Sequence, residues 1–256
     1  MSLRLPLILL LVLPASAMAD ATLTYANKNL PGGQTIIQVK DGNVLMGDAR
    51  ANMLFKEGKK ELVVIDHESR SYMVMDEETA KKLEQQLGAV QEQMNAMMQQ
   101  MQQQMQNMSE EERAQLQQML GGRMPMGEPK QIKTTVQEQG EDTVAGVTCT
   151  KMMVLVNDKP SGDVCVATAG VLGIDTNDYN SMVSATDAVR DFVERVSGRH
   201  DNDAVTMNLR AMKGIPIRMR DLLDGDVTIL DSRSSADLDA KLFTIPAGYQ
   251  KTDMLR

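Results

Sequence analysis

The stretch that decides the fold is ELVVIDHESRSYMVMDEETAKKLEQQLGAV, residues 61–90, because its apolar pattern changes half-way along. Glu61–Asp66 and Ser71–Met75 are short apolar and β-branched runs, and the polar residues 67–70 separate them. This arrangement predicts a β-hairpin. After Asp76, apolar residues recur at alternating steps of four and three, which is typical of a helix. The chain therefore combines sheet and helix, and we expect an α+β protein.

The helical pattern continues far beyond this stretch. Asp76 is a plausible N-cap, and an apolar seam follows it, made of Leu83, Leu87, Val90, Met94, Met97, Met101 and Met108. Ser109 and Glu112 form a capping box for a second short helix, Glu110–Leu120. The pattern predicts a Met/Gln-rich helical hairpin inserted at about residues 77–120. A disordered low-complexity linker is the alternative, since Gln-rich tracts often stay unfolded.

Strand patterns flank this insertion on both sides. Before it, residues 20–75 have the pattern of strands and turns, with runs at Ala21–Tyr25 and Thr35–Val39. After it, we expect a strand at Gln131–Gln139. A second hairpin is predicted from Val147–Val156 and Asp163–Thr168, joined across residues 157–162. Further strands follow around Gly214–Asp221 and Asp226–Asp231, and the last apolar segment is Leu242–Tyr249.

One more amphipathic helix is expected near Asn177–Ser197. Its apolar stripe is Tyr179, Met182, Val183, Val189, Phe192, Val193 and Val196, and Gly198 ends it. A stripe of this width needs an apolar surface to cover, so we expect the helix to pack on the sheet.

The first nineteen residues have the pattern of an export signal. Arg4 supplies the positive end, Leu5–Leu13 the apolar run, and Ala17-Met18-Ala19 a small-residue cleavage site. The run is shorter than the roughly 20 residues that a spanning helix needs. We therefore expect cleavage after Ala19, a periplasmic protein, and no transmembrane segment in residues 20–256, which form a single β domain with the helical insertion.

Composition argues against some partners. The formal net charge of −8 repels phosphate backbones, so we expect no nucleic-acid binding. The chain has no Trp, three Phe and four Tyr, so aromatic platforms for sugars or bases are scarce.

Cys149 and Cys165 are the only cysteines in a chain with an export signal, which favours a disulfide between them. They lie on predicted neighbouring strands and have the same parity, so they share a face whenever opposed positions sum to an even number. Two unpaired buried thiols are the alternative. The absence of a C-x-x-C spacing argues against redox catalysis.

Catalytic and metal-binding motifs are not found, and we expect neither an enzyme nor a cofactor. The sequence has no G-x-S-x-G, P-loop or H-E-x-x-H motif. Its two histidines, His67 and His200, fall in predicted turns and are expected to be exposed. Asp175-Thr176-Asn177-Asp178 lacks the spacing of an EF-hand, and helix capping explains it better.

The methionine stripe, defined as Met94, Met97, Met98, Met101, Met105 and Met108, has three interpretations. The side chains either pack within the hairpin or against the sheet, or form an adaptable surface for apolar ligands. Alternatively, their soft thioethers bind Cu(I) or consume oxidants. The apolar seam also suits helix-mediated self-association.

Several short motifs resemble the bacterial domain-of-unknown-function family 4412 over most of residues 20–252. They are Gly146-Val147-Thr148-Cys149-Thr150-Lys151, Gly214-Ile215-Pro216-Ile217-Arg218, and Leu242-Phe243-Thr244-Ile245-Pro246-Ala247-Gly248-Tyr249-Gln250-Lys251, together with the Met/Gln-rich helix that runs into Glu111-Glu112-Arg113-Ala114-Gln115-Leu116. That family resembles the periplasmic LolA-type lipoprotein carriers. The resemblance implies a curved antiparallel half-barrel with helices over its concave face. At Cys165 it leads us to expect a large aromatic residue, which suggests that a disulfide has replaced a packing contact.

The resemblance supplies no catalytic residues. We therefore expect non-enzymatic binding of an apolar envelope ligand, a lipid or acyl chain, on the concave face of the sheet. Cu(I) binding or oxidant buffering by the methionine stripe, and a purely structural envelope role, are the alternatives.

Overall fold

The computed structural model describes residues 20–30, 32–106, 133–197 and 209–253. Within these ranges one 12-stranded sheet dominates, in the order β12-β6-β5-β4-β3-β2-β1-β11-β10-β9-β8-β7. The strands are β1 (Ala21–Ala26), β2 (Gln34–Lys40), β3 (Asn43–Gly47), β4 (Ala51–Lys56), β5 (Glu61–Asp66), β6 (Ser71–Met75), β7 (Thr134–Val144), β8 (Val147–Val156), β9 (Lys159–Ala167), β10 (Ile215–Asp221), β11 (Val227–Ser234) and β12 (Gln250–Lys251). The helices are α1 (Glu77–Gln106), α3 (Thr176–Ser197), α4 (Leu209–Met212), and the 3₁₀ turns η1 (Glu57–Lys59) and η3 (Ala240–Phe243).

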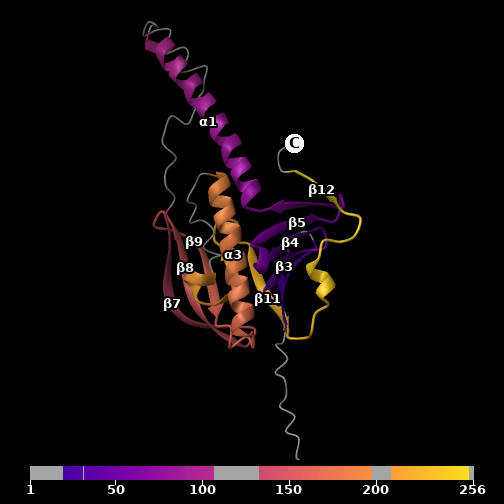
Figure 1. Ribbon diagram of the computed structural model, residues 1–256. Helices are drawn as coiled ribbons and strands as arrows, with labels where there is room; N and C mark the ends of the chain where they lie inside the picture. The colour runs from indigo at the N-terminus through magenta and orange to yellow at the C-terminus, as the bar shows by residue number, and fades with distance from the viewer. Residues whose placement is uncertain (1–19, 31, 107–132, 198–208, 254–256) are drawn as a thin grey trace, which may run out of the picture.

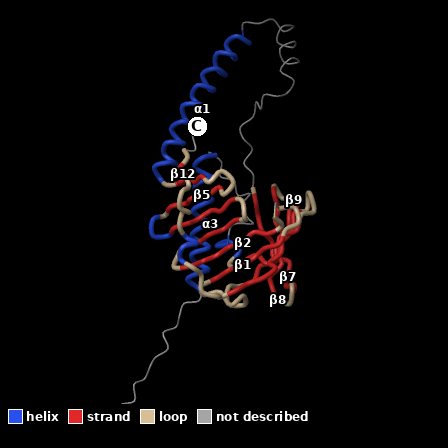
Figure 2. Tube along the Cα trace, turned by 90° about the vertical axis from the view of Figure 1, so that its right-hand side faces the viewer, coloured by secondary structure: helices blue, strands red, loops and turns tan. Residues whose placement is uncertain are grey.

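The sheet is open and curved. Its strands pair antiparallel, except that β12 runs parallel to β6. The pairing of β1 with β11 joins the two halves of the sheet, which bend around α3 (Figure 1). Figure 2 shows the strands continuing from β5 through β2 and β1 to β7 and β8, with α1 projecting beyond them. The expected α+β class and curved antiparallel sheet are therefore present, and the sheet does not close into a barrel.

Two-residue turns set the register of the long hairpins. Asn157 and Asp158 both have positive φ, 50° and 62°, as a type I′ turn requires. The prediction of a longer connection across residues 157–162 is therefore wrong, and β9 begins at Lys159. β7 also extends further than expected, to Val144, and its ladder with β8 is interrupted between Glu138 and Glu141.

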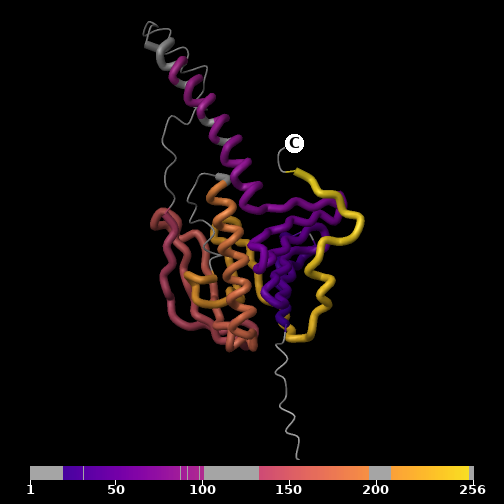
Figure 3. The backbone as a smooth tube through the Cα atoms, viewed as in Figure 1, coloured from indigo at the N-terminus to yellow at the C-terminus, as the bar shows by residue number. Residues whose placement is uncertain are grey.

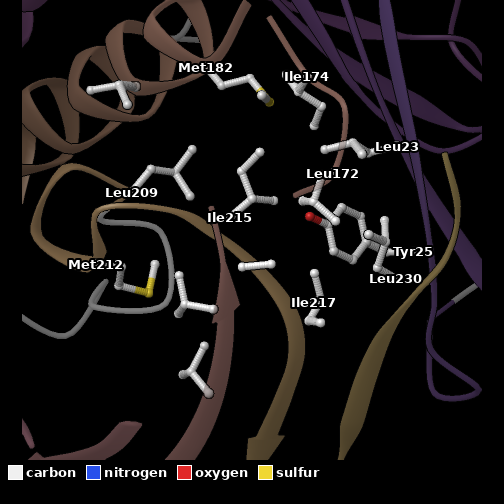
Figure 4. Packing of buried hydrophobic residues seen from close by; sticks show 14 of the residues in the cluster. Leu23, Tyr25, Leu172, Ile174, Met182, Leu209, Met212, Ile215, Ile217 and Leu230 are labelled. Atoms are coloured by element: carbon white, nitrogen blue, oxygen red, sulfur yellow. The ribbon is translucent and has the colours of Figure 1, made fainter. Parts of the chain in front are cut away.

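The inner, concave face of the sheet carries the larger core. Met182, Val183 and Ala185 of α3 are buried against it, so the helix covers the sheet as expected. Figure 4 shows Met182 above Ile215 and Leu209 in this cluster. Val193 of the predicted stripe is 48% exposed, whereas Val189 and Phe192 are half-buried against this cluster.

The outer face of β3 to β5 has a second, smaller core. Leu45, Leu54 and Val63 are buried there together with Ile65 and Phe243. Leu238, Ile245 and Tyr249 are half-buried beside them. The Leu242–Tyr249 segment is therefore a cover made of the 3₁₀ turn η3 and extended chain. Figure 3 shows this yellow C-terminal stretch running alongside the indigo strands.

Helix α1 begins as the sequence predicted. The side chain of Asp76 accepts a hydrogen bond from the N–H of Thr79 at 2.8 Å, so it caps the helix. Leu83 is buried, but Val90 is 59% exposed, and Figure 1 shows the helix leaving the sheet after its first turns. The second predicted helix, Glu110–Leu120, lies outside the described residues.

Candidate functional site

An apolar cavity lies between the inner face of the sheet and the helices. Its volume is about 380 Å³. Almost all of its walls are apolar, and one side opens to solvent. The lining residues are Tyr25, Thr35, Ile37, Met46, Gly47, Ala51, Asn52, Met53, Val64, Met182, Thr186, Leu209, Ile215, Pro216, Met219 and Thr228. These come from seven strands and two helices, so only the folded chain brings them together.

Strand register builds the floor of the apolar cavity. Ile37 is opposite Met46, Met46 is opposite Met53, and Met53 is opposite Val64. Residues that pair across strands point to the same face, so these four form one continuous apolar row over β2 to β5. The two methionines give this floor flexible side chains that adapt to irregular shapes.

Gly47 stands at the edge of the apolar cavity, and no other residue fits its position. Its φ is 153°, and a Cβ there would collide with the carbonyl oxygen of Ala51 and the Cα of Asn52. The glycine lets β3 and β4 approach closely at the point where the cavity opens.

Tyr25 supplies a polar group inside the apolar wall. The residue is 5% exposed, and its hydroxyl makes no hydrogen bond with any described residue. Figure 4 shows this oxygen on the side of the ring that faces Ile215. Burial raises the pKa of the phenol above its ordinary value, so the group is a neutral donor. A buried tyrosine hydroxyl usually has a partner, and Tyr25 lines the apolar cavity, where its hydroxyl has none among the described residues.

The helical cover is tied together by polar contacts. The Tyr179 hydroxyl of α3 donates to the carbonyl oxygen of Leu209 in α4 at 2.9 Å. Arg210 donates to one carboxylate oxygen of Asp187 through Nε at 3.0 Å and Nη2 at 2.7 Å. These bonds hold Leu209 and Met182 over the apolar cavity.

Charged residues stand beside the mouth of the apolar cavity. A shallow hollow that also uses Gly47 is lined by Asp48, Arg50, Asp66 and Glu68. Backbone N–H groups, first that of Arg50, lower the pKa of Asp48, and the N–H of Ser69 does the same for Asp66. Both carboxylates are therefore charged at neutral pH. The mouth thus joins an apolar interior to a polar rim.

His67 lies next to this rim in the β5–β6 turn, so the predicted turn location is correct, but the side chain is half-buried and hydrogen-bonded and not fully exposed as expected. The Tyr249 hydroxyl and His67 Nδ1 are 2.8 Å apart. The Nε2–H of His67 donates to Asn52 Oδ1 at 2.6 Å, and the Asn52 amide nitrogen then reaches the carbonyl oxygens of Asp48 and Ala51. This chain of bonds connects the outer cover to the cavity rim. His200 lies outside the described residues.

The methionine stripe is not part of the apolar cavity. Met94 is 51% exposed and Met97 67% exposed, so these two side chains do not pack against the sheet. Packing within the predicted hairpin depends on residues 110–120, which lie outside the described residues. α1 also contains positions 98, 101 and 105, whose side chains lie outside the described residues, as does Met108 entirely. Among the described residues there is no group of three His, Cys, Asp or Glu side chains arranged to hold a metal ion.

The predicted disulfide is confirmed. Cys149 on β8 and Cys165 on β9 are bridged, with their Cα atoms 5.5 Å apart. Lys151 is the direct partner of Cys165, so the bridge runs diagonally between neighbouring strands. Both cysteines are buried in the inner core, where the bridge has a packing role.

The N-terminal end of α3 also matches its prediction in part. Asp175 accepts from the N–H of Asn177 at 2.7 Å, so it caps the helix. Asp178 in the same motif is buried, and its Oδ2 has no hydrogen-bond partner among the described residues. Sequence alone gave no sign of an acidic group in such surroundings.

Comparison with known proteins identifies the family. The model described as "Domain of unknown function (DUF4412)" matches residues 79–249, more than half of the 256 residues. The chain belongs to this family. The resemblance expected over most of residues 20–252 is confirmed from α1 onward, while β1 to β6 lie outside the matched range.

Other comparisons are less informative. A search of curated proteins found no match. One similar solved structure is the crystal structure of an uncharacterized conserved protein from Thermus thermophilus. It is 6% identical, has a TM-score of 0.42, and the alignment covers 92% of this chain and 91% of that chain. No described helix is long and apolar enough to cross a membrane.

Proposed function

We propose that this protein binds an apolar envelope ligand, a lipid or acyl chain, without chemical conversion. The apolar cavity between the sheet and α3 is the observation that carries the proposal. We further propose a periplasmic location after cleavage behind Ala19. In this view the curved sheet acts as a LolA-like half-barrel whose concave face receives the guest.

The size of the apolar cavity supports a ligand rather than a packing defect. Its volume of about 380 Å³ lies within the roughly 300–1,000 Å³ of ordinary ligand sites. An engineered apolar cavity of about 150 Å³ already binds benzene. Each Å² of apolar surface buried by a guest contributes about 25 cal/mol, so a short alkyl segment would gain several kcal/mol.

Its chemistry supports a guest that is mostly apolar with one hydrogen-bond acceptor. The row of Ile37, Met46 and Met53 offers adaptable apolar contact. The hydroxyl of Tyr25, which has no hydrogen-bond partner in the described part of the chain, would donate to a carbonyl or carboxylate oxygen of the guest. A fatty acid or an acyl ester has this combination, and the charged rim would meet its more polar end.

The first experiment identifies the guest. The protein is purified from its own cell envelope without detergent and studied by native mass spectrometry and lipid extraction. A co-purifying lipid or acyl compound at near-stoichiometric amount is expected. A protein that carries no co-purifying lipid, and whose melting temperature no tested lipid changes, would contradict the proposal.

A matched pair of variants localises binding to the apolar cavity. Ile37→Trp fills it, whereas Ile36→Trp adds the same volume to the next residue of β2, which is 40% exposed on the other face. We expect Ile37→Trp to weaken binding of a fluorescent fatty acid at least tenfold and Ile36→Trp to leave it within twofold. If both variants changed fatty-acid binding equally, the ligand would bind outside the apolar cavity.

Exposure of the methionine stripe supports a second candidate, Cu(I) binding or oxidant buffering. Met94 and Met97 are one helical turn apart and accessible to solvent. Cu(I) titration under reducing conditions, compared with a variant in which Met97, Met98 and Met101 are Leu, tests it. Stoichiometric Cu(I) that is lost in the variant is expected, and unchanged binding would exclude this candidate.

The same exposed residues also suit self-association through the apolar seam. Sedimentation of the wild-type chain and of a variant with Val90, Met94 and Met97 changed to Gln tests this partner proposal. Concentration-dependent dimers that the variant loses are expected. If both chains sediment as monomers, and neither lipid nor Cu(I) binds, a purely structural envelope role remains.

A further inference from the structure

A buried acid that lacks a hydrogen-bond partner among the described residues marks a second site, at the N-terminal end of α3. Asp178 is 8% exposed, and its Oδ2 makes no hydrogen bond within the described residues. Burial raises its pKa to about 6, and the negative charges of Asp175, Asp20 and Asp41 add to the shift. Such a group needs either a proton or a cation to be stable.

Asp178 lines a cavity of about 420 Å³, here called the Asp178 cavity. Its walls are the start of β1, the loop before α3, the first turn of α3 and the end of β11. Arg233 lines it but is exposed, and its guanidinium forms no ion pair with an acid in the described part of the chain. Lys40, a half-buried cation beside Asp20, is already engaged at 2.7 Å by both Asp20 and Asp237.

The position of Asp20 in this wall is fixed. The residue is 6% exposed, and its carboxylate accepts from Lys40 Nζ and from the N–H of Leu238, each at 2.7 Å. Both donors bond to the same carboxylate oxygen, Oδ2, so the side chain is held in place together with the start of β1 beside it. Asp20 and Asp178 line the same cavity.

We propose that the Asp178 cavity receives a primary ammonium group, and that its source is the α-amino group of Asp20 after export processing. The proposal rests on cleavage behind Ala19. Hydrolysis of the Ala19–Asp20 peptide bond by an envelope peptidase adds one water. It leaves a carboxylate on Ala19 and an α-ammonium on Asp20, where the intact chain has a neutral amide.

This change places a positive charge where the structure has a surplus of acids. The α-ammonium would compensate Asp178 first and would reduce the repulsion from Asp20, Asp175 and Asp41. Processing would then stabilise the end of β1 against α3. A free primary amine is the other source of the same chemistry, and the test below separates the two.

The experiment compares two processed forms of the full chain. Wild-type protein expressed with its own residues 1–19 is recovered from the cell envelope, and intact mass gives its first residue. A second form carries Gly-Ser-Gly between Ala19 and Asp20, which keeps the cleavage motif and moves the α-amino group about 10 Å along the chain. Asp178→Asn is made in both forms, with Glu68→Gln, an exposed acid in the β5–β6 turn, as the control.

At pH 7 we expect Asp178→Asn to change the melting temperature in opposite directions in the two forms. Asp178→Asn lowers the melting temperature by about 3 °C or more when Asp20 is the first residue, because a charge pair is lost. It raises the melting temperature in the extended form, because an unpaired buried charge is removed. Glu68→Gln shifts both forms equally. In the form that starts at Asp20, the α-amino pKa also lies above its ordinary value of about 7.7–8.0, and Asp178→Asn lowers it.

Three results would overturn the proposal. The first is a processed protein that begins at a residue other than Asp20. The second is a melting-temperature shift by Asp178→Asn that has the same sign in both forms. The third is an α-amino pKa that Asp178→Asn leaves unchanged. Methylammonium is then added to both forms to test whether the Asp178 cavity binds an external amine. If it stabilises only the extended form, the α-amino source is supported; if it stabilises the processed form equally, the cavity serves an external amine. Fatty-acid binding is measured in parallel and does not depend on this outcome.

Discussion

The two faces of strands β3 to β5 are built from alternating residues of the same short sequence, yet one is sealed and the other encloses a cavity. On the outer face Leu54 and Val63 are fully buried under Phe243. On the inner face Met53 and Val64 remain half-buried and line the apolar cavity. An extended segment follows a curved sheet closely, whereas a helix is a straight cylinder about 10 Å wide and leaves space beside it. The shape of the cover therefore decides which face can take a ligand.

The largest effect is expected from removing the outer cover. Phe243→Ala should cost about 3–5 kcal/mol of unfolding free energy, because a buried aromatic ring leaves a cavity in a sealed core. Leu242→Ala is the control, since Leu242 is 43% exposed, and it should cost about 0.5 kcal/mol or less. Urea denaturation measures both. Similar costs for the two variants would show that the segment does not seal this face.

Adjacent residues of β4 test the comparison directly. Leu54→Ala should cost about 2–5 kcal/mol, because its side chain is fully buried on the outer face. Met53→Ala should cost clearly less, about 1 kcal/mol, because that side chain already borders empty space. It should also enlarge the apolar cavity and change ligand preference toward bulkier acyl chains. Equal destabilisation by the two variants would contradict the difference between the faces.

A smaller effect is expected where the two faces are connected. Tyr249→Phe removes the hydroxyl beside His67 Nδ1 and should cost about 1 kcal/mol. Chemical denaturation gives this value. Fatty-acid affinity should stay within about twofold, because the lost bond lies behind the rim and not in the apolar cavity. A loss of affinity much larger than this would mean that the rim residues contact the ligand.

The smallest effect on stability is expected from substitution of Tyr25. Tyr25→Phe removes a hydroxyl that has no partner among the described residues, so the unfolding free energy should change by no more than about 0.5 kcal/mol. Binding of a fatty acid should nevertheless weaken by about threefold to tenfold, the equivalent of one neutral hydrogen bond. Affinity that is unchanged, with stability lowered as in Tyr249→Phe, would assign the Tyr25 hydroxyl a structural role.

Local patterns predicted several elements correctly. The β5–β6 hairpin, the Asp76 cap and the α3 helix follow from residue spacing and capping chemistry, which act over a few positions. The disulfide followed from compartment and strand parity. β3 and β4 were not assigned individually, because both of their faces are apolar and the alternation that identifies a strand is lost. The two-residue turn at Asn157–Asp158 is shorter than the predicted connection across residues 157–162, because β9 accommodates Pro160 beside a register shift in its ladder with β8.

The candidate site was much harder to predict than the fold. The sequence drew attention to methionines that repeat along α1, whereas Met46 and Met53 of the apolar cavity carry no local signal. They become a surface only when β2 to β5 align in register. Tyr25 has the pattern of an ordinary β-strand residue, and only the folded structure shows that its hydroxyl has no hydrogen-bond partner among the described residues. Tyr249 in the family motif Leu242–Lys251 likewise shows its role only through its contact with His67.

By itself the sequence determined the α+β class, the predicted export signal, the disulfide, the start of α1 and the extent of α3, because periodicity, capping and cysteine pairing are local or nearly local. Only the tertiary structure decided which amphipathic faces are covered. α3 is enclosed by the curved sheet, whereas α1 leaves the sheet after Leu83 with Met94 and Met97 exposed. It also decided where space remains, since the apolar cavity and the burial of Asp178 depend on residues that are distant in the sequence. Packing against a particular partner is a property of the assembled chain, and no window of sequence contains it.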